Sequence, residues 1–142
     1  MSKLICLLIT NSLFLFSLQG QRLTSFHQSI PIAEDISDIT VAFSKPFQVE
    51  TWPNKTVLIE TTVQIDKVSK KVLKHLVNSG RYTVKQEDYA GAIKLRLSAR
   101  LDKPIVSQLG PCEEEILYKV YVPERLQLHT IGAQEVLSLI HI

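Results

Sequence analysis

The residues of this chain that could do chemistry are few, and the densest group of them is acidic. Glu113, Glu114 and Glu115 directly follow Cys112. Carboxylates are the ligands that calcium prefers, but the ion takes about six to eight oxygens. We therefore interpret the three glutamates as the charged beginning of a strand. Neighbouring negative charges disfavour the reactive thiolate, so we expect Cys112 to be an inert thiol, with pairing to another chain as the alternative.

The other candidates for catalysis or metal binding are isolated. His27, His75 and His129 have no partner at the spacing of metal ligands, and we expect His75 and His129 to face solvent. The sequence has no glycine-rich phosphate loop, no paired-cysteine zinc motif and no G-x-S-x-G nucleophile elbow. We predict no catalytic, no cofactor-binding and no metal-binding residue, and a protein that is not an enzyme.

The charge balance limits the class of partner. The chain has 16 lysines and arginines and 14 acidic residues, a net charge of +2. This near-neutral balance gives no reason to expect a nucleic-acid partner. Three classes of ligand remain as alternatives: a surface, a polysaccharide or a protein.

Residues 1–20 have the layout of a secretory signal peptide. Lys3 is followed by a mostly apolar run over residues 4–18 and then by Gly20, a small residue suited to a cleavage site. The alternative is a membrane anchor, but the run is short against the ~20 residues that span a bilayer. We expect an exported protein, in the periplasm, on the outer surface or outside the cell, without a transmembrane span after cleavage. Residues 21–35 are expected to be an N-terminal extension.

The segments that would carry a binding surface are predicted to be mainly β-strands. Residues 36–41 are β-prone, and residues 46–65 alternate between apolar and polar on both sides of the Pro53-Asn54 turn, which predicts an antiparallel hairpin with Trp52 as a turn anchor. Further strands are expected at 82–84, 93–101, 116–122 and 126–130. The predicted core is Ile93, Leu95, Leu97, Val120 and Val122, and Pro123 and Gly132 are predicted to set turns.

One segment has the spacing of a helix instead. Apolar residues recur every three or four positions over residues 67–78, with Asp66 or Ser69 as the N-cap and Gly80 after the last turn. Four lysines occupy the rest of its surface, namely Lys67, Lys70, Lys71 and Lys74. This basic face could contact anionic lipid or polysaccharide, or it could simply be solvated.

Two stretches carry a resemblance to a known family. The segment FQVETWPNKTVLIETTV and the segment EILYKVYVPERLQLHTIGAQEV resemble a bacterial adhesin-like family of the cell envelope, a domain of unknown function. The resemblance covers roughly residues 36–136 and implies a single-stranded β-solenoid of stacked short strands. The helix at 66–80 departs from the family pattern and reads as an insertion.

The last six residues, LSLIHI, resemble a translated sequencing adapter. We therefore expect residues 137–142 to be an artefact and residues 36–136 to be a truncated β-rich domain. The predicted fold is mainly β with one amphipathic helix, either the start of a β-solenoid or a helix on an antiparallel sheet. The predicted function is a non-catalytic, adhesin-like protein of the envelope or exterior. The alternative is a small periplasmic module that holds an apolar ligand in a cavity lined by Val72, Leu76, Leu95 and Leu97.

Overall fold

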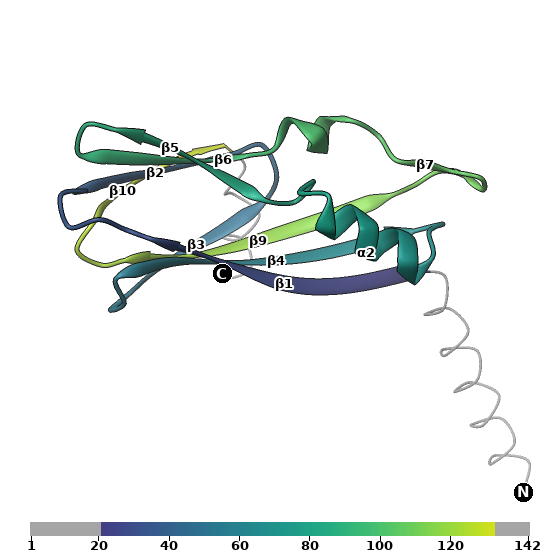
Figure 1. Ribbon diagram of the computed structural model, residues 1–142, viewed down its shortest axis with the longest axis horizontal. Helices are drawn as coiled ribbons and strands as arrows, with labels where there is room; N and C mark the ends of the chain where they lie inside the picture. The colour runs from purple at the N-terminus through teal and green to yellow at the C-terminus, as the bar shows by residue number, and fades with distance from the viewer. Residues whose placement is uncertain (1–20, 133–142) are drawn as a thin grey trace, which may run out of the picture.

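The computed structural model describes residues 21–132, and within them the chain forms two stacked sheets and one α-helix (Figure 1). The expected signal peptide at 1–20 and the expected artefact at 137–142 lie outside the described residues. The lower sheet has the strand order β1 (Gln21–Pro31), β4 (Thr56–Asp66), β9 (Glu114–Pro123), β3 (Phe47–Trp52). The upper sheet has the order β10 (Gln127–Gly132), β2 (Asp38–Phe43), β6 (Ala92–Leu97), β5 (Val84–Tyr89).

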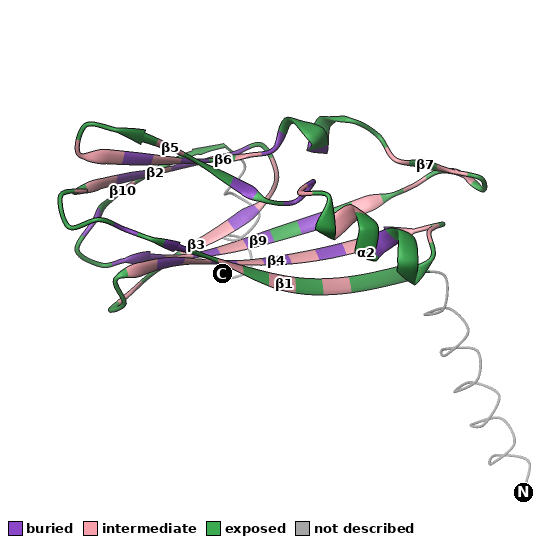
Figure 2. Cartoon of the chain, in the orientation of Figure 1, coloured by how far each residue is buried: buried purple, intermediate pink, exposed green. Residues whose placement is uncertain are grey.

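The core lies between the two sheets, where alternate residues of each strand point inward. Along β4 and β9, buried positions alternate with less buried ones (Figure 2). Aromatic rings join the layers: the Phe43 ring on β2 lies 5.2 Å from both Phe47 on β3 and Tyr118 on β9. Of the predicted core, Ile93, Leu95, Val120 and Val122 are buried, whereas Leu97 is only partly buried.

Both sheets are mixed, which corrects the expectation of an antiparallel sheet. The pairs β3–β9, β2–β6 and β2–β10 are parallel, and the pairs β1–β4, β4–β9 and β5–β6 are antiparallel. The predicted hairpin over 46–65 is wrong, because β9 lies between β3 and β4. The alternation of apolar and polar residues does not reveal this error, because a strand alternates in the same way beside a parallel neighbour as beside an antiparallel one. The partner is chosen by tertiary packing.

The N-terminal residues belong to the domain. Gln21–Pro31, expected to be an extension, forms β1 and pairs with the whole length of β4. The long strand expected at 93–101 ends early: β6 stops at Leu97, and Ser98 caps a 3-10 helix, η1 (Ala99–Asp102). The turn of η1 brings Leu101 into the core, where it is 5% exposed.

The predicted helix is confirmed over Lys70–Asn78 as α2. Ser69 is its N-cap, because its hydroxyl accepts a hydrogen bond from the Val72 N–H at 3.1 Å. Gly80 has a φ of +83°, the left-handed conformation expected after the last turn. Leu73 is the residue of α2 that is buried, and the helix lies at one end of the two layers, beside the ends of β1 and β4 (Figure 1).

Candidate functional site

The candidate site is the edge of β9 that β3 leaves uncovered. β9 begins at Glu114, but β3 begins at Phe47, which is paired with Tyr118. Residues 114–117 therefore pair with β4 on one side and, within the part of the chain that the structure describes, have no neighbouring strand of the lower sheet on the other. The last bond to the β3 side runs from the Tyr118 N–H to the Pro46 carbonyl, at 3.4 Å. Since backbone direction alternates along a strand, the backbone groups of Glu114 and Ile116 also point to this open side.

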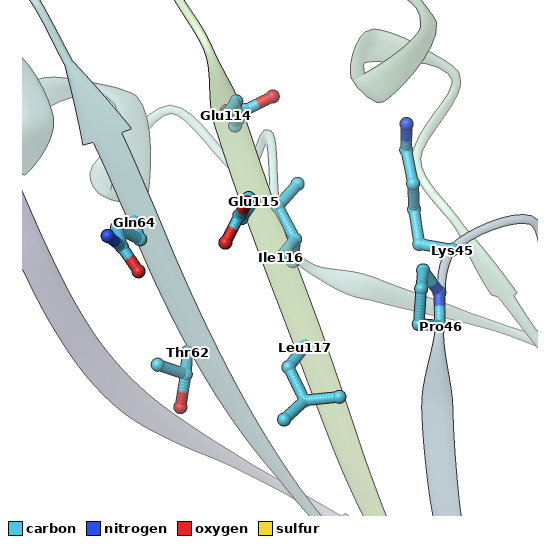
Figure 3. Close-up of a pocket in the computed structure, with 8 residues that line it drawn as sticks. All are labelled: Lys45, Pro46, Thr62, Gln64, Glu114, Glu115, Ile116 and Leu117. Carbon is cyan, nitrogen blue, oxygen red and sulfur yellow. The ribbon is translucent and has the colours of Figure 1, made fainter. Parts of the chain in front are cut away.

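A hollow of about 540 Å³ surrounds this edge, and we call it the β9 groove (Figure 3). In Figure 3, Thr62 and Gln64 of β4 lie on one side of β9, and Lys45 and Pro46 lie on the other. The remaining lining residues belong to β9 itself: Glu114, Glu115, Ile116 and Leu117. The groove thus combines an unpaired strand edge with one exposed apolar residue, Leu117, one amine and one exposed carboxylate. Such a surface suits an extended chain that adds as a strand.

The start of β9 is held in place by a buried ion pair. Glu114 points into the molecule and accepts two hydrogen bonds from Arg81, from Nη2 at 2.7 Å and from Nε at 3.1 Å. The Tyr82 hydroxyl donates a third bond to Glu114, at 2.5 Å. The side chains of Arg81 and Glu114 are 7% and 13% exposed, so both charges are largely removed from water.

Arg81 also ties this pair to the connection after β6. Its Nη1 donates to the Arg100 carbonyl at 2.6 Å, and its Nη2 donates to the Lys103 carbonyl at 3.0 Å. Burial lowers the pKa of Arg81, but the hydrogen bond and the negative charge of Glu114 outweigh it, and the net pKa is raised above its usual value. One guanidinium therefore links α2–β5, η1 and the first residue of β9, which fixes the edge that lines the groove.

Sequence reasoning missed this pair, although a signal was present. The prediction of a charged strand start holds for Glu115, which is exposed, whereas the Glu114 side chain is largely buried. The alternation of Ile116, Tyr118, Val120 and Val122, extended back by two residues, places Glu114 on the inner face. A buried carboxylate needs a charged partner, and the location of Arg81 became known only from the structure.

The histidines and Cys112 do not gather at the groove. His75 and His129 are exposed, as predicted, and His27 and His129 lie 3.5 Å from Glu60 and 3.4 Å from Asp38, respectively. Cys112 is half-buried and free, with Sγ 3.9 Å from the Gly110 carbonyl oxygen. Within residues 21–132, no three of the His, Cys, Asp and Glu side chains come together in a way that could hold a metal ion.

Trp52 is the turn anchor that the sequence predicted. Its Nε1 donates to the Thr56 carbonyl at 2.8 Å, which closes the turn between β3 and β4. Its ring lies 5.2 Å from that of Tyr121 on the outer face of the lower sheet, and Lys119 Nζ lies 5.1 Å above the Tyr121 ring. Among the residues that the structure describes, no helix is long and apolar enough to cross a membrane.

Two buried tyrosines make stability sensitive to high pH. Burial raises the pKa of Tyr82 and of Tyr118 well above the usual value, with a further contribution from Glu114 to each. Because the folded protein retains these protons while the unfolded chain releases them, stability is complete below about pH 10 and falls as the pH rises further. We expect the unfolding free energy to drop by about 1.4 kcal/mol per pH unit for each tyrosine.

Urea denaturation at pH 9, 10.5 and 11 measures this slope. The Tyr82→Phe variant removes one of the two groups, so its slope above pH 10 should be about half as steep. An unchanged slope in that variant would show that Tyr82 ionises equally well in the folded protein. The exposed Tyr89 is the matched control, and its replacement by phenylalanine should leave most of the slope intact.

The chain matches no known family model, no curated protein and no solved structure. The function is therefore inferred from the geometry of the chain itself.

Proposed function

We propose that this protein is a non-catalytic, adhesin-like protein of the cell envelope or exterior, and that it acts through a β-surface that extends by parallel strand addition. The observation that carries the proposal is the asymmetry of the two sheets. β6, β2 and β10 form a parallel series in the upper sheet, and β9 and β3 form a parallel series in the lower sheet. Among residues 21–132, both series end in a strand with no further partner, β10 in the upper sheet and β3 in the lower sheet.

The opposite side of the sandwich is closed. The Gln28 side chain of β1 makes two hydrogen bonds to the Val84 backbone of β5, from Nε2 to the carbonyl at 2.9 Å and from the Val84 N–H to Oε1 at 3.0 Å. The rings of Phe26 and Tyr82 meet above this bridge, with centroids 6.2 Å apart. Stacked β-proteins need a closed terminal unit and grow from the other side. This arrangement supports a solenoid that begins at the β1–β5 side and grows past β10 and β3.

The strand order of the chain supports the same direction of growth. One short connection, residues 44–46, leads from the upper to the lower sheet and joins β2 to β3. Because β10 lies parallel to β2, residue by residue from Gln127↔Asp38 to Gly132↔Phe43, a strand that follows β10 along the same path would lie parallel to β3. Its backbone would bond to the open edge of β3.

The backbone groups that would receive such a strand can be named. The Pro46 carbonyl accepts a hydrogen bond from Tyr118 of β9 and the Trp52 carbonyl accepts one from Glu124, directly after β9, so residues at even positions of β3 face β9. By alternation the N–H groups of Val49 and Thr51 face the open edge. Exposed strand edges of this kind pair with other chains unless they are blocked.

Replacing Thr51 by proline tests the proposal. Proline removes one N–H from the open edge and leaves the β3–β9 ladder intact, because edge strands tolerate proline where the N–H faces outward. We expect the unchanged protein to associate with increasing concentration in sedimentation velocity, and the Thr51→Pro variant to associate at least about tenfold less tightly. Thr51→Val retains the N–H and should behave as the unchanged protein.

If the protein without substitutions stays monomeric over the whole concentration range, strand addition at this edge is contradicted. The adhesin-like role needs a second readout, which is retention of the exported protein on immobilised envelope polysaccharides and on host-surface proteins. Turnover of any substrate by the purified protein would contradict the non-catalytic role.

A hollow beside α2 favours the second candidate, a module that holds an apolar ligand. It measures about 450 Å³ and includes Val72, as the sequence predicted, but its other apolar walls are Val68 and the segment Ile105–Leu109. Leu95, predicted to line such a cavity, is fully buried in the sandwich core. Binding of a fluorescent fatty-acid analogue at one site per chain, abolished by Val72→Asp, would favour this candidate.

A further inference from the structure

The exposed apolar residues of this protein concentrate at one end. Among residues 21–132, seven large apolar side chains are exposed, and three of them line one hollow beside α2. They are Val72 at 43% exposure, Val106 at 67% and Leu109 at 77%. Isolated exposed apolar residues are ordinary, but a cluster marks an interaction surface.

A projecting turn carries two of these residues. β7 (Val106–Ser107) and β8 (Gly110–Pro111) form a small antiparallel ladder that extends beyond both sheets (Figure 1). Leu109 lies at its tip, where the Ser107 hydroxyl accepts a hydrogen bond from the Leu109 N–H at 3.1 Å. Between this turn and Val72 lies the hollow beside α2.

Basic side chains border this apolar end. Lys67, Lys70, Lys71 and Lys74 are exposed, and residues 67–83 contain no acidic residue. Lys67 donates to the Pro111 carbonyl at 2.9 Å and lies 3.9 Å from Asp66. Lys70, Lys71 and Lys74 form no ion pair with any residue of the described part of the chain. The acidic groups at this end are Asp66, which also accepts a bond from the Glu113 N–H at 2.7 Å, Glu113 itself and the exposed Glu115, which lines a small hollow with both of them.

The position of the lysines opposes the stability of their own helix. Lys70 and Lys71 occupy the first turn of α2, which has no acidic residue. The N-terminus of a helix carries partial positive charge, so cations there are unfavourable and anions are favourable. An external anion at this point would compensate the two lysines and the helix N-terminus.

The N-terminal segment joins the domain at the same end. β1 begins at Gln21, which pairs with Asp66 one residue before Lys67, and Arg22 Nε donates to the Val68 carbonyl at 3.4 Å. The chain that precedes Gln21 is mostly apolar over residues 4–18. In the precursor, before cleavage, attachment of that segment to a bilayer would bring this end of the sandwich to the lipid surface.

We propose that this end, which we call the basic tip, docks on an anionic lipid surface. Leu109, Val106 and Val72 enter the interface between headgroups and acyl chains, and the lysines of α2 contact the headgroup phosphates. Amphipathic surfaces with apolar residues and lysines bind membranes in this way, in proportion to buried apolar area and to the attraction of anionic lipid. An anionic polysaccharide would match the lysines but would offer no apolar phase to the three exposed side chains.

Cosedimentation with vesicles tests the proposal. The exported protein is used as recovered, with its N-terminus determined by mass spectrometry, on vesicles of pure phosphatidylcholine and on vesicles containing phosphatidylglycerol. Each lysine near an anionic surface is worth about fivefold in partition. We expect the Lys70→Ala/Lys71→Ala/Lys74→Ala variant to lose about a hundredfold of the preference for anionic vesicles.

A matched control changes the net charge equally at other places. Lys55, Lys85 and Lys94 lie in the β3–β4 turn, on β5 and on β6, away from the basic tip. Their triple replacement by alanine should change the partition by less than about fivefold. Equal losses in the two triple variants would overturn the proposal, because only the net charge would then matter.

A tryptophan at the tip reports insertion directly. The chain has a single tryptophan, Trp52, at the opposite end of β4 from Asp66. We expect the Leu109→Trp variant to shift its emission to the blue on anionic vesicles and to be quenched by brominated lipid, while the emission of the unchanged protein stays constant. Retention on anionic polysaccharide with no quenching by brominated lipid would also overturn the proposal.

Discussion

Replacement of Arg81 by methionine is expected to lower the free energy of unfolding by about 3 to 5 kcal/mol. The variant leaves the Glu114 carboxylate largely buried, with the Tyr82 hydroxyl as its remaining side-chain partner. It also removes the donors to the Arg100 and Lys103 carbonyls. An unpaired buried charge costs far more than the pair contributes, because removal from water is no longer compensated.

The double variant Arg81→Met/Glu114→Leu distinguishes the interaction between the two side chains from the separate contribution of each. Since both charges are then absent, it should be more stable than Arg81→Met, and its loss should be well below the sum of the two single losses. Urea denaturation of the four proteins completes the cycle. Additive losses would show that the two side chains do not act as one unit.

The cycle also bears on the β9 groove. Glu114 is the first residue of β9 and lines the groove. Because Arg81→Met removes the ion pair that holds this end of β9, we expect faster amide hydrogen exchange at residues 114–117 in that variant. The matched control is Arg96→Met, which removes an exposed guanidinium 2.8 Å from Glu87. An exposed pair of this kind contributes about 0 to 1 kcal/mol, and its loss should leave amide exchange in β9 unchanged.

Replacement of Leu95 by alanine is expected to cost about 2 to 5 kcal/mol. Leu95 lies on β6, the central strand between β2 and β5, and its side chain is fully buried between the sheets. The lost methyl groups leave a cavity that neighbouring strands, held by ladders on both sides, cannot fill by moving together. Thermal or urea unfolding measures the loss.

Leu97 is the matched comparison, two residues along the same strand and on the same face. The sequence placed both leucines in the core, but Leu97 is only partly buried, because β6 ends there and the chain turns into η1. We expect Leu97→Ala to cost less than about 2 kcal/mol. Equal losses at the two positions would show that the end of β6 is packed as tightly as its centre.

The local elements of this protein were readable from its sequence because their signals are local. The two-residue alternation of β4 and β9, the three-to-four-residue spacing of α2, the Ser69 cap and the left-handed Gly80 each depend on neighbours within a few positions. The same reasoning placed four buried residues in the core, Ile93, Leu95, Val120 and Val122. It also identified the turn after Pro123, where the Leu126 N–H donates to the Pro123 carbonyl at 3.0 Å.

Only the tertiary structure decided which strands are neighbours. An alternating strand buries the same face whether its partner is parallel or antiparallel, so residues 46–65 could be read as a hairpin although β9 lies between the two strands. For the same reason the placement of β1 in the sheet, the open edge of β9 and the partnership of Arg81 with Glu114 escaped the sequence. Each depends on residues tens of positions apart, such as the 33 that separate Arg81 from Glu114, and such contacts are set by the packing of the whole sandwich.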